Sequence, residues 1–374
     1  MFHPFPEVKN RFGFGCMRLP MKGDQVNHEE TCAMVDAFLE AGFNYFDTAH
    51  GYINEMSEPA LKACLTSRYP RERYLLTDKL TYNYFNTPEE VRPFFQLQLD
   101  QCGVEYFDFY LIHAVGKSNY EHYKKCRAFE QAFELKKEGK IRHVGFSFHD
   151  QADFLDQVLQ DYPETEVVQI QFNYADYEDS GVQSRLCYEV CVKHGKPCII
   201  MEPVKGGSLV NLPADAQGLL DALHSGSPAS YALRFCASFE NNFMTISGMS
   251  NMAQMKDNIA TMKDFTPLSD SEQEVIRKVQ AIFHGLDIVP CTGCQYCVPH
   301  CPQHIKIPDL FNVYNRKKQY NEWNQDHYYH VITQQGGKAS DCIKCGRCMP
   351  HCPQHLKIPD LLVDVAGVFD KPQA

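Results

Sequence analysis

A cysteine pattern that occurs twice near the C-terminal end constrains this chain more than any other feature of its sequence. The first copy, "CTGCQYCVPHCP", begins at Cys291, and the second copy, "CIKCGRCMPHCP", begins at Cys342. Each copy places three cysteines at two-residue spacings, a fourth cysteine three residues later, and then a proline. Both copies continue as "QH-x-KIPDL", so the two segments form an internal repeat. This spacing predicts metal ligation rather than disulfide bonds.

The spacing is typical of two [4Fe–4S] clusters, in which the fourth cysteine of each run ligates the other cluster. We therefore assign cluster one to Cys291, Cys294, Cys297 and Cys352, and cluster two to Cys342, Cys345, Cys348 and Cys301. Structural zinc is the alternative, but zinc is usually held by two Cys-x2-Cys pairs. It would not require the additional central cysteine or the Cys-Pro in both copies. The assignment makes the two copies one folding unit.

The remaining composition argues against several classes of function. The 374 residues carry a formal net charge of −11, which disfavours a nucleic-acid partner. No apolar run approaches the length of a membrane span. The start "MFHPFPEVKN" lacks the regions of a secretory signal, and the cysteines outside the repeat are scattered without framework spacing. We expect a cytoplasmic protein with free thiols, from an anaerobic bacterial host, and we leave its oligomeric state open.

Eight short β-rich runs precede the repeat. We predict strands at Arg11–Met17, Phe43–Ala49, Arg73–Leu80, Phe107–Ala114, His143–Asp150, Val167–Tyr174, Pro197–Val204 and Phe243–Ser250. Helical periodicity predicts helices at His28–Ala41, Ser57–Ser67, Pro88–Cys102, Tyr120–Glu138, Asp150–Gln160, Gly181–His194, Ala216–Phe239 and Asn251–Met262. Eight alternating units predict an α/β fold, a (β/α)8 TIM barrel. An open doubly wound sheet is the alternative, but "GFGCM" is not the glycine-rich turn that such a sheet usually carries.

The barrel pattern ends near Asp264, so we expect a barrel domain at residues 1–264. "TPLSDSEQEVIRKVQAIFHG" then begins with turn residues and continues as an amphipathic helix, which indicates a helical linker at residues 265–287. From residue 288 to residue 374 the composition shifts to cysteine, histidine, proline and glutamine. We expect a small α+β ferredoxin-like iron–sulfur domain there.

Polar residues mark the ends of three consecutive predicted strands. Asp47 and, just beyond it, Tyr52 follow the second strand, Lys79 ends the third, and His113 ends the fourth. Catalytic groups of barrel enzymes lie at this end of the strands. Lys79, held by Asp47, can lower the pKa of Tyr52. His113 can donate a hydrogen bond to a carbonyl oxygen, and Tyr52 can exchange a proton as hydride moves to or from carbon.

Four segments in this order carry a family resemblance. "FDTAHGYINEMSE", "LLTDKL", "CGVEYFDFYLIHA" and "GKIRHVGFSFH" resemble successive motifs of the aldo-keto reductases, over roughly residues 11–263. The tail resembles that of a branch with a C-terminal ferredoxin-type domain. The resemblance implies a catalytic tetrad of Asp47, Tyr52, Lys79 and His113, and NAD(P)(H) bound across the barrel mouth.

The resemblance also implies a set of dinucleotide contacts. Ser147 and Gln169 correspond to carboxamide contacts, with Asn173 as a further candidate. Backbone near Gly206, Gly207 and Ser208 can approach a pyrophosphate, and the segment from Gly248 into the last helix suits a phosphate. The candidate cofactor-binding residues are Ser147, Gln169, Asn173, Gly206, Gly207, Ser208, Gly248, Ser250, Gln254 and Asn258.

Three departures from the family pattern bear on the cofactor. Met201 or Glu202 stands where the family has an aromatic residue that stacks on the nicotinamide, and Phe148 replaces an asparagine. The basic residues that hold a 2′-phosphate align with Gly248 and Gln254, and a hydroxyl position aligns with Met249. The identity of the cofactor therefore stays open between NADH, a weakly bound dinucleotide and another redox partner.

The sequence predicts an oxidoreductase that acts on a small carbonyl or alcohol, with Tyr52 as proton donor or acceptor and NAD(P)(H) as hydride carrier. Electrons can also be exchanged with the two clusters and with an external one-electron carrier such as ferredoxin. A flavin- or ferredoxin-coupled enzyme that does not use nicotinamide is one alternative, although the sequence shows no flavin motif. A non-catalytic redox-sensing or docking module is another.

Overall fold

The computed structural model describes residues 4–320 and 325–370, so the outer ends of the two expected domains, residues 1 and 374, lie outside the described residues. Eight parallel strands close into a barrel in the order β1-β10-β9-β8-β7-β6-β5-β4. All eight strand predictions are confirmed. The strands are β1 (Phe12–Gly15), β4 (Tyr45–Asp47), β5 (Leu75–Leu80), β6 (Phe107–Val115), β7 (Ile141–Phe148), β8 (Val167–Gln171), β9 (Cys198–Met201) and β10 (Asn242–Gly248). A hairpin of β2 (Met21–Lys22) and β3 (Gln25–Val26) follows β1.

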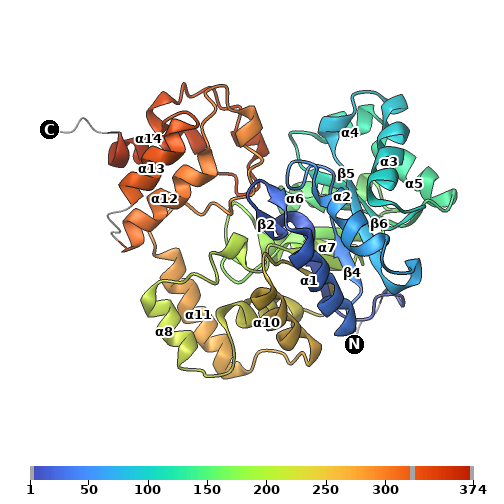
Figure 1. The fold of residues 1–374 in the computed structure, drawn as a ribbon, viewed down its shortest axis with the longest axis horizontal. Helices are drawn as coiled ribbons and strands as arrows, with labels where there is room; N and C mark the ends of the chain where they lie inside the picture. The colour runs from blue at the N-terminus through green and yellow to red at the C-terminus, as the bar shows by residue number, and fades with distance from the viewer. Residues whose placement is uncertain (1–3, 321–324, 371–374) are drawn as a thin grey trace.

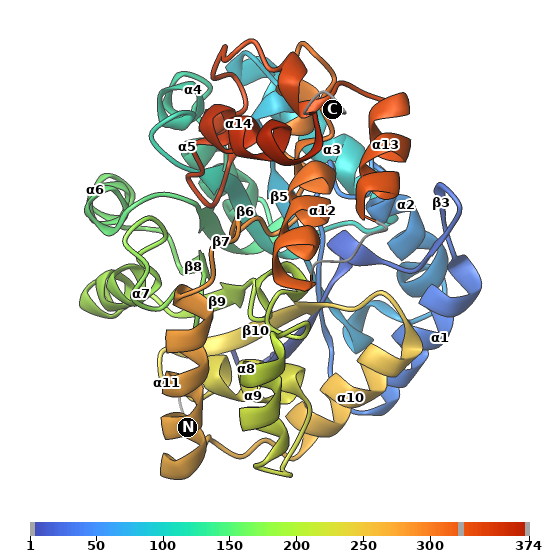
Figure 2. The same cartoon turned by 90° about the vertical axis from the view of Figure 1, so that its left-hand side faces the viewer.

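Helices surround the ring of strands, as Figure 2 shows. They are α1 (His28–Glu40), α2 (Ser57–Leu61), α3 (Pro88–Cys102), α4 (Tyr120–Lys125), α5 (Ala128–Lys137), α6 (Ala152–Asp161), α7 (Ser184–Lys193), α8 (Ala214–Asp221), α9 (Pro228–Ala237) and α10 (Met252–Lys263). A π-helical turn, Lys62–Thr66, continues α2. This architecture confirms the predicted (β/α)8 barrel.

Two helices that we predicted as continuous are each divided in two. The predicted helix Tyr120–Glu138 breaks at Arg127, whose φ of 53° lies in the left-handed region and cannot continue an α-helix. The predicted helix Ala216–Phe239 breaks before Ser227, whose side chain accepts a hydrogen bond from the Ser230 N–H and so begins a new helix. Proline in the first turn of α9 suits the same start.

The segment before β1 closes one end of the barrel. The ring of Phe5 lies 5.0 Å from that of Phe109 and 4.8 Å from that of Phe243, measured between centroids. Phe109 and Phe243 stand near the beginnings of β6 and β10, so Phe5 fills the N-terminal end of the barrel interior. The opposite end, where the strands finish, is therefore the end left for a site.

The C-terminal unit begins after a helix that packs on the barrel. This helix, α11 (Asp270–His284), starts with a capping box between Ser269 and Glu272, and it shares a core cluster with α8. The unit itself contains α12 (Ile307–Tyr320), α13 (Gln325–Gln334) and α14 (Ile358–Phe369) around its own hydrophobic core (Figure 1). Its β-structure is slight, since the described residues there form one isolated bridge, between Ile305 and Gly337.

The C-terminal unit is seated on the strand-end side of the barrel by close backbone packing. Gly206, just after β9, has a φ of 63°, and a Cβ atom built there would lie 2.2 Å from the carbonyl oxygen of Thr292. No side chain fits at this position. Arg18, after β1, donates a hydrogen bond of 2.9 Å to the same carbonyl oxygen. Thr292 is thus held by two separate loops of the barrel.

Further hydrogen bonds join the two units. The buried Lys205 ammonium, which pairs with Asp176, also donates to the side-chain oxygen of Gln354 at 3.1 Å. The hydroxyl of Tyr82 lies 2.9 Å from Nδ1 of His351. These contacts fix the second cysteine copy, as well as the first, against the barrel.

Among the described residues, every helix is too short or too polar to cross a lipid bilayer. The cytoplasmic location stays a prediction.

A buried acidic cluster lies behind the third barrel strand. The carboxyl groups of Glu58 and Asp78 are both fully buried, and Gln98 donates hydrogen bonds to them, at 3.3 and 3.1 Å. His50 lies 2.8 Å from the other oxygen of Glu58. Burial raises the pKa of Glu58 to about 7 and, with the charge of Glu58, raises the pKa of Asp78 well above its ordinary value. The cluster therefore takes up protons when the chain folds.

The stability of the protein should depend on pH through this cluster. Because the folded-state pKa of Glu58 lies above 4.5, its stabilising effect is complete below that pH and is lost as the pH rises through about 7. We expect this change to lower the free energy of unfolding by about 3 kcal/mol, at roughly 1.4 kcal/mol per pKa unit.

Urea unfolding of the wild type and of Glu58→Gln, at about pH 5 and about pH 8, measures this effect. The substitution should remove most of the pH dependence, whereas Glu40→Gln, at an exposed carboxylate, should leave it unchanged. Equal pH dependence in wild type and Glu58→Gln would contradict the assignment.

Candidate active site and cluster sites

Four polar side chains meet at the strand-end side of the barrel. The Lys79 ammonium donates hydrogen bonds to Oδ1 of Asp47 at 2.6 Å and to the carbonyl oxygen of Thr48 at 2.7 Å. Gln169 donates to the other carboxylate oxygen of Asp47 at 3.1 Å. The Lys79 nitrogen also lies 4.8 Å from the centroid of the Tyr52 ring. The structure thus brings Asp47, Lys79 and Tyr52 together, as we expected.

His113 completes this group. Its ring lies edge-on to that of Tyr52, with 6.0 Å between centroids, and its Nδ1 lies 2.7 Å from the hydroxyl oxygen of Thr81. Burial, together with the charge of Lys79, lowers the pKa of His113 well below its ordinary value. The imidazole is therefore neutral. If Thr81 donates to Nδ1, the proton of the neutral ring is on Nε2 and is free to be donated.

The electrostatics of Tyr52 differ from the sequence-based expectation. We expected Lys79 to lower the pKa of Tyr52, but burial and the negative charge of Asp47 raise it well above its ordinary value. Asp47 offsets much of the positive charge of Lys79, because the two groups are in direct contact. Tyr52 therefore holds its proton, so its phenol is in the form that can donate a proton.

A tyrosine of the C-terminal unit reaches the same group, and sequence reasoning missed it. A hydrogen-bonding interaction with Tyr296 acts to lower the pKa of Tyr52 and opposes the effect of burial. The ring of Tyr296 also lies edge-on to that of His113, at 6.3 Å between centroids. The available signal was an asymmetry of the repeat, because Tyr296 stands between two cysteines where the second copy has Arg347.

Two cavities meet at this group. One has a volume of about 500 Å³ and extends over β9, β10 and the loops that follow them. The other has a volume of about 620 Å³ and lies between the barrel loops and the C-terminal unit. Residues of both units line both cavities, and those shared by the two include Tyr52, His113, His149, Cys294 and Tyr296. Nδ1 of His149 has no hydrogen-bond partner, and burial lowers the pKa of this ring to about 3.

Most of the expected dinucleotide contacts line the first cavity. They are Gln169, Gly206, Gly207, Gly248, Ser250, Gln254 and Asn258. Three others do not line it. Ser147 accepts a hydrogen bond from the Ala114 N–H, Asn173 is fully buried and bonded to Asp176, and Ser208 lies outside the lining. We expected the backbone at Gly206 to approach a pyrophosphate. The group that lies close to it is the Thr292 carbonyl, so this glycine accommodates the C-terminal unit.

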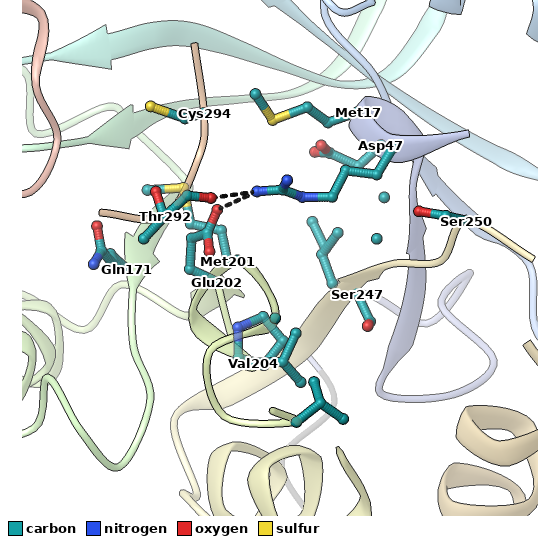
Figure 3. A pocket seen from close by; sticks show the side chains of 18 of the residues that line it. Met17, Asp47, Gln171, Met201, Glu202, Val204, Ser247, Ser250, Thr292 and Cys294 are labelled. Atoms are coloured by element: carbon teal, nitrogen blue, oxygen red, sulfur yellow. Dashed lines mark hydrogen bonds and ion pairs between the residues drawn. The ribbon is translucent and has the colours of Figure 1, made fainter. Parts of the chain in front are cut away.

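Arg18 places a positive charge in the first cavity, and the sequence analysis did not identify it. The Arg18 side chain packs against Gly248, and its guanidinium lies 3.7 Å from the Glu202 carboxylate as well as bonding to Thr292. Figure 3 shows Thr292 and Glu202 together on one side of the cavity, opposite Ser250. A cation is thus present where alignment had suggested that none remained.

The other departures from the family pattern have structural counterparts. Met201 and Glu202 both line the first cavity, so no aromatic ring is present at this place in its wall. Phe148 and Met249 are buried in the hydrophobic core and point away from the cavity lining. Neither of these two side chains is placed to contact a ligand in the first cavity.

The eight cysteines of the repeat gather in two groups, each drawn from both copies. One small cavity is lined by Cys291, Cys294, Cys297 and Cys352. A second is lined by Cys301, Cys342, Cys345 and Cys348. These are the two sets assigned from the spacing. Each set offers four sulfur atoms and no competing carboxylate, a donor set that fits a cubane iron–sulfur cluster.

Burial raises the pKa of Cys291 to about 11 and that of Cys294 to about 12. Since the thiolate is the ligand, metal binding at these residues must release protons. The histidines beside the fourth cysteines, His300 and His351, stack on each other at 3.4 Å between centroids, and each also lines one of the two cysteine cavities.

Comparisons with known proteins agree with this division. The family model described as "Aldo/keto reductase family" matches residues 11–281, and the model described as "4Fe-4S dicluster domain" matches residues 290–356. An aldo-keto reductase from Mycobacterium avium is 26% identical over 71% of this chain and 85% of its own length. A glyoxal reductase from Bacillus subtilis is 28% identical over 60% of this chain and 73% of its own length.

Solved structures share the barrel. An aldo-keto reductase from Klebsiella pneumoniae in complex with NADPH aligns with a TM-score of 0.59 and 19% identity, over 72% of this chain and 90% of that protein. An aldo-keto reductase from Bacillus halodurans, in its holo form, aligns with the same TM-score and 23% identity. The chain therefore belongs to the aldo/keto reductase family, and it is an oxidoreductase whose barrel is followed by a 4Fe–4S dicluster domain.

Proposed function

We propose that this oxidoreductase reduces a small carbonyl compound, or oxidises the corresponding alcohol, with Tyr52 as the proton donor or acceptor and NAD(P)(H) as the hydride carrier. The observation that carries the proposal is the position of Tyr52. Its ring is in contact with Lys79 and His113, and it lies where a cavity for a dinucleotide and a second cavity for a substrate meet.

The residues divide the work of carbonyl reduction. NAD(P)H, when bound, supplies the hydride. The raised pKa of Tyr52 keeps the phenol protonated, so it can give its proton to the carbonyl oxygen as negative charge develops there. Neutral His113 can donate a second hydrogen bond to the same oxygen. Asp47 and Lys79 fix the geometry, and Gln169 holds Asp47 in place.

The first cavity suits a dinucleotide. It passes from Tyr52 to Ser250 and Gln254 at the beginning of α10, where the positive end of the helix dipole favours phosphate. Arg18 supplies a guanidinium that can pair with a phosphate oxygen if it leaves Glu202. The NADPH complex of the Klebsiella pneumoniae relative supports a nicotinamide cofactor here as well. The two matching family models give the flavin alternative no support.

The second cavity suits the substrate. Tyr82, Tyr84 and Asn54 of the barrel line it together with residues of the C-terminal unit, including Tyr296 and His351. Its aromatic and amide lining favours a small, polar, uncharged or planar compound. Because the C-terminal unit forms one wall, we infer that this unit sets the size of the substrate.

Replacement of Tyr52 tests the proposal directly. Tyr52→Phe removes the proton donor and should lower kcat at least about a hundredfold, in line with the usual contribution of general acid catalysis. The assay is anaerobic NADH and NADPH oxidation with candidate carbonyls. Calorimetry should show unchanged dinucleotide binding. Wild-type turnover in Tyr52→Phe would refute the proposal.

We further propose that the two cysteine sets hold two [4Fe–4S] clusters. Iron and acid-labile sulfide should number about eight each per chain. Because Cys291 and Cys352 belong to one set, Cys291→Ser/Cys352→Ser should retain about half of the iron. Cys301→Ser/Cys352→Ser removes one ligand from each set and should lose nearly all of it.

The same variants distinguish this assignment from the alternative in which each copy binds its own cluster. In that case Cys291→Ser/Cys352→Ser would disrupt both clusters. Cys32→Ser, at a cysteine outside the repeat, is the matched control and should leave the iron content unchanged.

Tyr296 offers a test of the contribution of the C-terminal unit to catalysis. Tyr296→Phe removes the hydroxyl group that interacts with Tyr52 and should lower kcat about tenfold, with little change in the KM for the dinucleotide. Tyr328→Phe, at an exposed tyrosine of α13, is the control and should behave as wild type. Unchanged kcat in Tyr296→Phe would show that the C-terminal unit takes no part in proton transfer.

A further inference from the structure

The two copies of the cysteine repeat have the same backbone shape but different surroundings. Gly293 and Lys344 occupy equivalent positions, with φ values of 68° and 54°, and Gln295 and Gly346 are likewise equivalent, at 67° and 72°. A 3₁₀ turn follows the third cysteine in each copy. The two copies therefore form loops of the same shape, and the two loops have equivalent outer sides.

In the first copy this outer side is covered by the barrel. Thr292 is buried against Gly206 and Arg18, Cys294 lines both cavities, and Tyr296 interacts with Tyr52. The first copy thus uses its loop to dock a cluster site against a redox-active partner, the barrel of the same chain.

In the second copy the equivalent side is open to solvent. We call residues 342–348 the distal loop. Ile343, at the position of Thr292, is 61% exposed, and Cys345, at the position of Cys294, is the one exposed cysteine of the described chain. Lys344 and Arg347 flank Cys345 and are both exposed.

The charge of the distal loop contrasts with that of the chain. The whole protein has a net charge of −11, yet neither Lys344 nor Arg347 forms an ion pair with any carboxylate of the described residues. Lys344 also occupies a left-handed conformation that favours glycine, and the first copy has Gly293 there. A lysine at this position has a conformational cost, so we expect its charge to have a functional role.

We propose that the distal loop is the docking surface for an acidic one-electron carrier protein of the ferredoxin type. This inference rests on the proposal that Cys301, Cys342, Cys345 and Cys348 hold a cluster. Two unpaired cations steer an acidic partner, and Ile343 provides an apolar contact beside them. A carrier docked there exchanges one electron with the cluster, one being oxidised as the other is reduced.

Substitutions that remove both charges of the distal loop test the inference without harming the fold. Lys344→Gly/Arg347→Gln removes both charges and places glycine where the backbone favours it. Lys137→Gln/Lys263→Gln, at exposed lysines of α5 and α10, removes the same charge elsewhere. Iron content and NAD(P)H-dependent activity should match wild type in both variants, which separates this test from the proposed catalytic function.

The probe is a purified acidic two-cluster bacterial ferredoxin, oxidised and under argon, with binding measured by calorimetry. Wild type and Lys137→Gln/Lys263→Gln should bind it with an affinity that falls as salt is raised, and Lys344→Gly/Arg347→Gln should bind about tenfold more weakly. A basic c-type cytochrome should not bind Lys344→Gly/Arg347→Gln more weakly than it binds wild type.

Three results would overturn the inference. The first is the absence of ferredoxin binding to wild type that retains both clusters. The second is an equal loss of affinity in the two variants. The third is self-association of the wild type, seen by analytical ultracentrifugation and lost in Lys344→Gly/Arg347→Gln, which would assign the loop to a second copy of the chain.

Discussion

The packing of Thr292 on Gly206 is the contact on which the rest of the structure depends. Only glycine leaves room for the Thr292 carbonyl group, and its positive φ presents the backbone at the required angle. This contact holds the loop of the first cysteine copy over the strand ends of the barrel. Both cavities, and the approach of Tyr296 to Tyr52, exist because that loop is held there.

The consequence is an active site built from two units with different chemistry. The barrel contributes a buried Asp47–Lys79 pair and neutral His113, which in the proposed reaction assist transfer of a proton in step with hydride. The C-terminal unit contributes Cys294, from one cysteine set, to the wall of the same cavities. The proposed hydride site and a candidate one-electron site therefore share a boundary. The second set lies farther along the repeat, where its exposed Cys345 faces solvent.

Much of the fold could be predicted from the sequence because it depends on local periodicity. Eight β-rich runs alternated with helical periods, and the spacing of the cysteines indicated which ones would gather from different copies. The breaks in the two helices were not predicted. Arg127 interrupts one helix through its backbone conformation, and Ser227 begins another by capping it. Both signals are weaker in a sequence than apolar periodicity.

The candidate site was predictable where a residue acts at a strand end and unpredictable where contacts cross between units. Asp47, Tyr52, Lys79 and His113 follow from their place on the strands. Tyr296 and Arg18 do not, because their roles depend on how the C-terminal unit docks on the barrel. The protonated state of Tyr52 was also missed, since burial and the charge of Asp47 outweigh the nearby ammonium group.

The central claim is that the cluster unit forms a wall of the catalytic cavity. Electron paramagnetic resonance of the reduced protein, with and without saturating dinucleotide, tests this claim most directly. The signals are assigned with Cys291→Ser and Cys342→Ser. Dinucleotide should change the signal of the cluster held by Cys291, Cys294, Cys297 and Cys352 and leave the other unchanged. Identical spectra in both states, with dinucleotide shown to be bound, would contradict the account.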